Sequence, residues 1–322
     1  MVCAWVPKAG SLPVRPGSAE IQNPISMTHL SSHTTAKALF QPYPNGGADA
    51  RHEEAHGWHV RDIAFEQIDR ARIEGNEDLF YLLMGASFIE TGSDTYASNL
   101  AEHYREYPEI ADWLRNRWER EELQHGAALR RYVETVWPGF PWQAAYDSFF
   151  AEYSRLCTVE ELNEDRQLEM VARCVVETGT TAYYHTLREL SDEPVLRQLL
   201  GHIRSDEVGH FKYFLKYFKQ LQQESPVGRG RIAGALYARL KELRESDSDV
   251  ALRHVYAHKG WYFSDRNRSF AEVAQRAYQL ISTQLPADLA VRMLLKPLLL
   301  PPRLEGYLYA PITRLATRVM AP

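Results

Sequence analysis

Two copies of a Glu-x-x-His motif stand far apart in the chain, each in a stretch without helix-breaking residues. The first is Glu122 with His125 in RWEREELQHG, and the second is Glu207 with His210 in SDEVGH. Residues i and i+3 of a helix project from the same face. Each motif therefore presents one carboxylate and one imidazole side by side, which is half of a dimetal site.

Two lone glutamates complete a ligand set. Glu90 lies in LLMGASFIETGSD and Glu177 in MVARCVVETGTTAYY, both apolar stretches with helical periodicity. The order Glu, Glu-x-x-His, Glu, Glu-x-x-His is that of a carboxylate-bridged dimetal site in a four-helix bundle. A solvated helix face explains any single motif equally well, but the interleaved set favours metal.

The charges in this set point to two metal ions. Buried carboxylates raise one another's pKa values, whereas two divalent cations balance the charge of all the glutamates. Mixed carboxylate and imidazole ligation is typical of iron or manganese rather than structural zinc. We therefore expect two iron ions, with manganese as an alternative at one or both positions. Glu121 and Asp206 each precede a ligand glutamate and are candidates to accept the free N–H of a ligand histidine.

Helical patterns that position these residues run through most of the chain. The sequence predicts helices at 50–73, 77–104, 108–136 and 142–156, then one from a capping box at Thr158–Glu161 to Leu190 and one from Pro194 to Gln223. Long helices with short connections imply an antiparallel bundle. Further helices are predicted at 229–246, 250–258, 269–284 and 287–296.

We therefore predict an all-α fold, a ferritin-like four-helix bundle with additional N-terminal and C-terminal helices. Residues 1–49 are rich in Pro, Gly, Ser and Asn and are expected to be disordered or loosely packed, with Met27 as an alternative start. Residues 50–225 would form the bundle, and residues 226–322 a C-terminal helical extension.

Composition narrows the class of protein. Of 322 residues, 45% are hydrophobic and 25% charged, as in soluble globular proteins. The net charge of −5 argues against a nucleic-acid partner. The three cysteines form no CxxC, which fits a reducing compartment. Without an apolar run of membrane-spanning length or a secretory signal pattern, we expect a cytoplasmic protein.

The motifs resemble those of the soluble acyl-carrier-protein desaturases, a family of ferritin-like di-iron proteins. The resemblance rests on WEREELQHG at 118–126, SDEVGH at 205–210 and the spacing of both lone glutamates, and it covers about residues 77–220. It implies that two irons are bound by Glu90, Glu122, His125, Glu177, Glu207 and His210. It also implies a catalytic role near the oxygen-binding face for Thr180, three residues past Glu177. The family's pairs usually read Glu-Glu-Asn-Arg-His and Asp-Glu-Lys-Arg-His, so the differences here leave the substrate open.

The predicted function is that of an oxygen-activating di-iron oxidoreductase, a desaturase or oxygenase acting on an unactivated C–H bond, with a fatty acyl thioester as one candidate substrate. The alternative is an iron-binding or ferroxidase-type ferritin-like protein without an organic substrate. No Gly-rich dinucleotide fingerprint occurs, so electrons are expected from an external donor such as a ferredoxin. An acyl-carrier protein and a second copy of the chain, forming a homodimer, are further expected partners.

Other di-iron classes fit less well. The ribonucleotide reductase small subunit has a radical tyrosine four residues past the first motif's histidine, where this chain has Leu129. Di-iron N-oxygenases add a histidine one turn before the last ligand glutamate, but Ile203 occupies that position and His202 is off by one. Ferritins are much shorter, and rubrerythrins carry a CxxC site.

Several other residues have both a functional and a packing interpretation. Trp58, Trp118, Tyr183 and Tyr184 are candidates to relay electrons, although aromatic packing is the default, and Cys174 is expected in the core. His52, His56 and His59 fit a solvated helix face better than a metal site. Lys212, Lys216 and Lys219 form a basic stripe, for which solvent exposure is favoured over docking of an acidic carrier.

The C-terminal tail combines apolar and basic residues. The segment Met293–Leu300 is apolar and is followed by Arg303, Arg314 and Arg318. Peripheral membrane contact is one interpretation. Docking onto the bundle or onto a second subunit is favoured over it.

Overall fold

The computed structural model describes residues 57–157, 162–243 and 248–320, and from Trp58 onward these belong to one compact unit. Every element in these ranges is helical, which confirms the all-α fold. Within them no helix is both long and apolar enough to cross a bilayer. The predictions for residues 1–49, His52, His56 and the capping box at Thr158–Glu161 lie outside the described residues.

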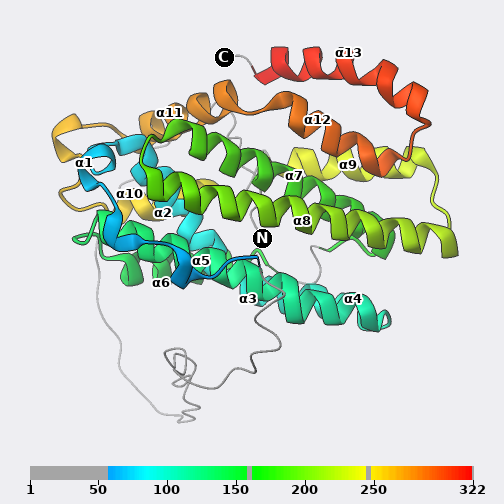
Figure 1. Cartoon of the computed structure of the whole chain (residues 1–322), viewed down its shortest axis with the longest axis horizontal. Coiled ribbons are helices and arrows are strands. Elements are labelled where there is room, and N and C mark those ends of the chain that lie inside the picture. The colour runs from blue at the N-terminus through cyan, green and yellow to red at the C-terminus, as the bar shows by residue number, and fades with distance from the viewer. Residues whose placement is uncertain (1–56, 158–161, 244–247, 321–322) are drawn as a thin grey trace, which may run out of the picture. The chain divides into compact units, whose positions relative to one another are not determined.

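A bundle of four helices forms the centre of this unit (Figure 1). They are α2 (Glu77–Thr91), α5 (Glu119–Val136), α7 (Arg166–Leu190) and α8 (Pro194–Glu224). Helices α7 and α8 pack along each other, α2 packs along α5, and α5 contacts α8. Asp165 and Glu193 cap the N-termini of α7 and α8 by accepting backbone N–H groups, and Pro194 occupies the first position of α8. The predicted four-helix bundle is therefore present.

Further helices lie around the four-helix bundle. Before α5 the chain forms η2 (Val60–Asp62), η3 (Phe65–Gln67), α1 (Arg70–Ile73), α3 (Ser93–His103), α4 (Pro108–Trp113) and the π-helical turn η4 (Leu114–Trp118). After α5 come α6 (Trp142–Tyr153), α9 (Arg229–Leu243), α10 (Ser248–His258), η6 (Ser264–Arg266), α11 (Phe270–Gln284), α12 (Ala287–Leu295), η7 (Lys296–Leu298) and α13 (Pro302–Met320).

The C-terminal helices cover the outside of the bundle. Helix α10 packs on α2 and α6, α11 on α2 and α7, and α9 and α12 on α7. With α5 on its other side, α2 is enclosed, and nearly every side chain from Leu79 to Glu90 is buried. A helix that is apolar all round is typically buried in this way. The extension thus completes the core around the helix that carries Glu90.

Four predicted helices differ from the structure. The helix predicted from Thr158–Glu161 to Leu190 begins only at Arg166, because the Asp165 side chain caps α7 there, and the described residues 162–165 are not helical. The described part of 50–73 consists of two 3-10 turns and the short α1. Trp58, Ile63 and Phe65 are buried there, but they lie along an irregular segment and do not form one face of a continuous helix. The helix predicted at 77–104 is interrupted: α2 ends at Thr91, the Gly92 N–H donates to the carbonyls of Phe88 and Ile89, and α3 begins at Ser93. The helix predicted at 108–136 contains the π-helical turn η4 just before α5.

Candidate metal centre

The six predicted ligands come together in the middle of the bundle. Helix α2 contributes Glu90, α5 contributes Glu122 and His125, α7 contributes Glu177, and α8 contributes Glu207 and His210. Each is at most 1% exposed. Burying so many ionisable groups without a compensating charge costs free energy. Bound cations would compensate the negative charge of the glutamates.

The ligand atoms form two overlapping groups, and within each group they lie within 4.8 Å of one another. One group contains Glu90 and His125, and the other contains Glu177 and His210. Both groups share Glu122 and Glu207. The arrangement fits two neighbouring metal ions bridged by these shared carboxylates, each with one further glutamate and one histidine.

Hydrogen bonds on the far side of each imidazole set its orientation. His125 Nε2 lies 3.0 Å from Asp206 Oδ2, and His210 Nε2 lies 2.8 Å from Glu121 Oε2. With Nε2 as the donor in each pair, Nδ1 is left to face the cluster. Glu121 and Asp206 were predicted to accept the free N–H of a ligand histidine. In the structure each acid bonds the histidine of the other motif.

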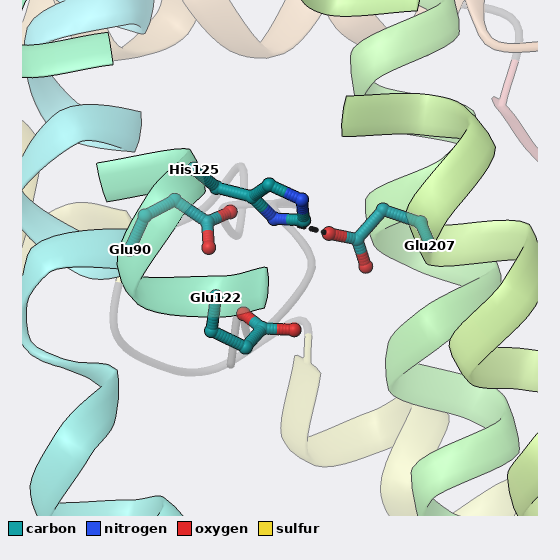
Figure 2. A group of neighbouring side chains, drawn as sticks. All are labelled: Glu90, Glu122, His125 and Glu207. Atoms are coloured by element: carbon teal, nitrogen blue, oxygen red, sulfur yellow. Dashed lines mark ion pairs between the residues drawn. The ribbon is translucent and has the colours of Figure 1, made fainter. Parts of the chain in front are cut away.

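Some buried atoms of the cluster lack hydrogen-bond partners. Among the described residues this holds for Nδ1 of both histidines, Oε2 of Glu90 and Oε1 of Glu207, all of which are buried. His125 Nδ1 lies 3.3 Å from Glu207 Oε1, a contact drawn in Figure 2, but the pair lacks the alignment of a hydrogen bond. His210 Nδ1 lies 3.2 Å from Glu122 Oε1. Buried nitrogen and oxygen acceptors gathered in two such groups fit hard or borderline cations such as iron and manganese.

Protons take up part of the charge in the metal-free cluster. Burial, with repulsion from Glu122 and Glu207, raises the pKa of Glu90 well above its usual value. Burial also raises the pKa of Glu177, to about 8. Burial alone would lower the pKa of each histidine, but hydrogen bonds and charge from the carboxylates around it raise the pKa well above 6.5. In the absence of metal, these side chains therefore bind protons more readily than they do in water, in place of metal ions.

Two hydroxyl groups on α7 contact the ligands. Thr180 Oγ1 donates to Glu207 Oε2 at 2.6 Å and to the Glu177 carbonyl at 3.1 Å. The Tyr184 hydroxyl donates to Glu90 Oε1. Thr180 is therefore at the site, as the resemblance implies. The contact of Tyr184 was not anticipated, although its spacing of seven residues from Glu177 places both on one helix face.

Aromatic rings surround both histidines. Trp58 Nε1 donates to Asp206 at 2.7 Å, and the Trp58 ring stacks on His125 and on His202. Trp118 approaches His210 edge-on, with ring centroids 6.3 Å apart. These rings exclude water from the imidazoles. Their suggested role in electron relay stays a prediction.

A close approach of two helices sets the distance between Glu90 and His125. Gly126 follows His125 on α5, and a Cβ atom at this position would lie 2.7 Å from the backbone N of Thr91 on α2. Only glycine allows the two backbones to come this close. The G at the end of RWEREELQHG was the signal in the sequence, but its role becomes clear only from the packing.

The remaining candidates lie outside the cluster. Among the described residues, His59 and His202 belong to neither ligand group. Cys174 is fully buried, as expected for a core thiol. Lys212, Lys216 and Lys219 are exposed on α8, and Lys216 pairs with Glu109 at 3.0 Å.

The chain was compared with protein families, curated proteins and solved structures, and it matches only solved structures. No family model and no curated protein matches the chain. The similar structures include a variant of an R2-like ligand-binding oxidase with an anaerobically reconstituted Mn/Fe cofactor, at 15% identity and a TM-score of 0.48, covering 84% of this chain and 91% of that chain. Another variant, with an aerobically reconstituted Fe/Fe cofactor, is 16% identical with a TM-score of 0.47 and the same coverage. Similarity at this level assigns neither a family nor an activity to the chain.

Proposed function

We propose that the protein is an oxidoreductase that activates dioxygen at a pair of metal ions, two irons or one iron and one manganese. The observation that carries the proposal is the pair of overlapping ligand groups that share Glu122 and Glu207. Supporting it are the buried Nδ1 and carboxylate oxygen atoms without hydrogen-bond partners. The metal pair, when bound, would supply the electrons that reduce dioxygen.

The protein's own residues hold this pair and control its surroundings. Glu122 and Glu207, which belong to both ligand groups, would be shared by the two ions. Asp206 and Glu121 fix the imidazoles, and the buried position of the cluster excludes water. The Thr180 hydroxyl, bonded to Glu207, is placed to hold or pass a proton beside the metal pair.

The finer proposal is a desaturase or oxygenase that attacks an unactivated C–H bond, with a fatty acyl thioester as the candidate substrate. It rests on the motif resemblance. External electrons from a ferredoxin, delivery by an acyl-carrier protein and a homodimeric state belong to the same proposal.

Metal loading tests the proposal. Anaerobic addition of ferrous iron is expected to give two irons per chain, and later exposure to oxygen is expected to give the absorption of an oxidised bridged cluster. Glu122→Ala or Glu207→Ala removes a carboxylate shared by both groups, so each variant is expected to lose both ions. Glu134→Ala, an exposed change on the same helix as Glu122, serves as the control and keeps both. Failure of the unaltered protein to bind two metal ions would refute the proposal.

The same experiment separates the enzyme from the ferroxidase alternative. An enzyme stops at two irons per chain through repeated cycles of iron and oxygen addition. A storage protein continues to accumulate iron, so uptake well beyond two per chain would favour the alternative.

A further inference from the structure

The last described helix, α13, packs differently from the rest of the protein. It contacts α12, and none of its described side chains is buried. Figure 1 shows it in red on the outer side of α12. Tertiary packing of an apolar face normally stabilises a helix. A helix of 19 residues in which no described side chain is buried therefore suggests a further binding surface.

The exposed side of α13 carries large apolar residues. Leu304 is 44% exposed, Tyr307 is 78% exposed and Leu315 is 62% exposed. Leu308 and Ile312, by contrast, are half-buried on the helix that packs on α12. The apolar stripe of α13 is thus wider than the part that α12 covers.

The same exposed side is basic. Arg303, Arg314 and Arg318 are exposed and form no ion pair with a described residue. The one acidic residue of α13, Glu305, is half-buried and pairs with Lys296 at 2.6 Å. A face without exposed carboxylates, in a chain with a net charge of −5, is a local concentration of positive charge.

We propose that the exposed face of α13 binds the surface of an anionic lipid bilayer. Alternating leucine, tyrosine and arginine on one face is the pattern of a helix that lies in the membrane interface, with apolar side chains inserted and guanidinium groups among the phosphates. Tyrosine is also favoured at this depth. A second copy of the chain fits less well, because a symmetric contact would bring these arginines together without any acidic residue between them.

Vesicle sedimentation of the full-length, metal-loaded protein tests this surface. Binding to vesicles of phosphatidylcholine mixed with phosphatidylglycerol is expected, with little binding to pure phosphatidylcholine and a loss of binding as salt increases. The combined variant Arg303→Gln, Arg314→Gln and Arg318→Gln is expected to bind on the order of 100-fold more weakly, because each basic residue near an anionic surface contributes about fivefold. The variant Leu304→Ser, Tyr307→Ser and Leu315→Ser is expected to lose binding as well.

Matched controls separate this face from overall charge and hydrophobicity. Lys212→Gln, Lys216→Gln and Lys219→Gln remove the same charge from exposed positions on α8, and Trp261→Ser removes a side chain that is 69% exposed elsewhere. Both are expected to bind vesicles like the unaltered protein. Because none of the described α13 side chains is buried, its variants are expected to keep their metal content and melting temperature.

Three outcomes would overturn the proposal. One is equal binding to both kinds of vesicle or to neither. Another is an equal loss of binding in the lysine variant. The third is a change in oligomeric mass, without lipid binding, when the α13 residues are replaced, which would assign the face to a second copy of the chain.

Discussion

His125 on α5 and Asp206 on α8 are joined by a hydrogen bond of 3.0 Å between Nε2 and Oδ2. The reciprocal bond joins His210 on α8 to Glu121 on α5. Each motif therefore supplies its own candidate metal ligands and also the acid that orients the histidine of the other. The two halves of the site depend on each other through these bonds.

Replacing Asp206 with Asn is expected to weaken metal binding roughly 10-fold to 100-fold, because the acid that orients His125 becomes a neutral amide. The measurement is a metal titration by competition with a chelator. Asp192→Asn, an exposed change near the start of α8, is expected to leave the affinity unchanged. An Asp206→Asn protein with normal affinity would show that the His125 orientation does not depend on this bond.

The stability of the metal-free protein is expected to fall as the pH rises from mildly acidic to mildly basic. Glu177 has a raised pKa of about 8 against an ordinary 4.5, so the stability linked to its proton is complete below 4.5 and is lost as the pH passes about 8. His125 and His210, with raised pKa values, contribute with the same sign above their ordinary 6.5.

The measurement of this effect is the melting temperature from pH 5 to pH 9, with and without metal. Metal ions take the place of these protons, so the loaded protein is expected to vary less with pH and to release protons on loading. Glu177→Gln is expected to flatten the metal-free profile. Parallel profiles for loaded and metal-free protein would contradict the assignment.

Gly126→Ala is expected to destabilise the protein by about 1–3 kcal/mol, because the new Cβ overlaps the backbone of α2 at Thr91. It would also move Glu90 away from His125 and weaken metal binding. Gly209→Ala, next to His210, is the matched control, since a Cβ there meets no atom within 4 Å. That change is expected to be neutral or to stabilise α8 by up to about 1 kcal/mol. The melting temperature and the metal content of both variants are the measurements. If Gly209→Ala lost as much stability and metal as Gly126→Ala, the close approach of α5 and α2 would not explain the effect.

Thr180→Ala is expected to leave two metal ions bound while altering how much oxygen is consumed per iron. The lost hydroxyl bonds Glu207 but is not itself a ligand. Thr178→Ala is the control, because the Thr178 hydroxyl bonds the Cys174 carbonyl within its own helix. Iron content and oxygen consumption are measured on the same preparation. Loss of iron as complete as in Glu122→Ala would make Thr180 structural, and unchanged oxygen consumption would remove it from the reaction.

The sequence predicted which side chains gather in the bundle because helical periodicity links spacing to direction. Glu122 and His125 share a face wherever the helix lies, and interleaving with Glu90 and Glu177 left few other arrangements. Contacts between distant helices were harder to predict. The choice of Asp206 for His125 and of Glu121 for His210, the bond from Tyr184 to Glu90, and the close approach at Gly126 all depend on how helices face each other in three dimensions.

The same limit explains the errors in the fold. The sequence predicted a continuous helix through Gly92 and another over the segment that contains Trp58. The apolar residues there are buried by tertiary packing and do not belong to one continuous helix. Local propensity is a weak guide where tertiary contacts decide.

The crossed bonds also bear on when the site can form during synthesis of the chain. They join residues that are 81 and 89 positions apart in the sequence. Both bonds therefore require α5 and α8 to be present in the same chain segment. A growing chain that ends before Glu207 lacks one shared carboxylate and the His210 imidazole and can offer only an incomplete site. Contacts of such long range form late in folding. On the proposed function, metal ions would meet the complete set of ligands only after α8 has been synthesised. Selection between iron and manganese would then depend on the supply of ions at that stage as well as on the geometry of the ligands.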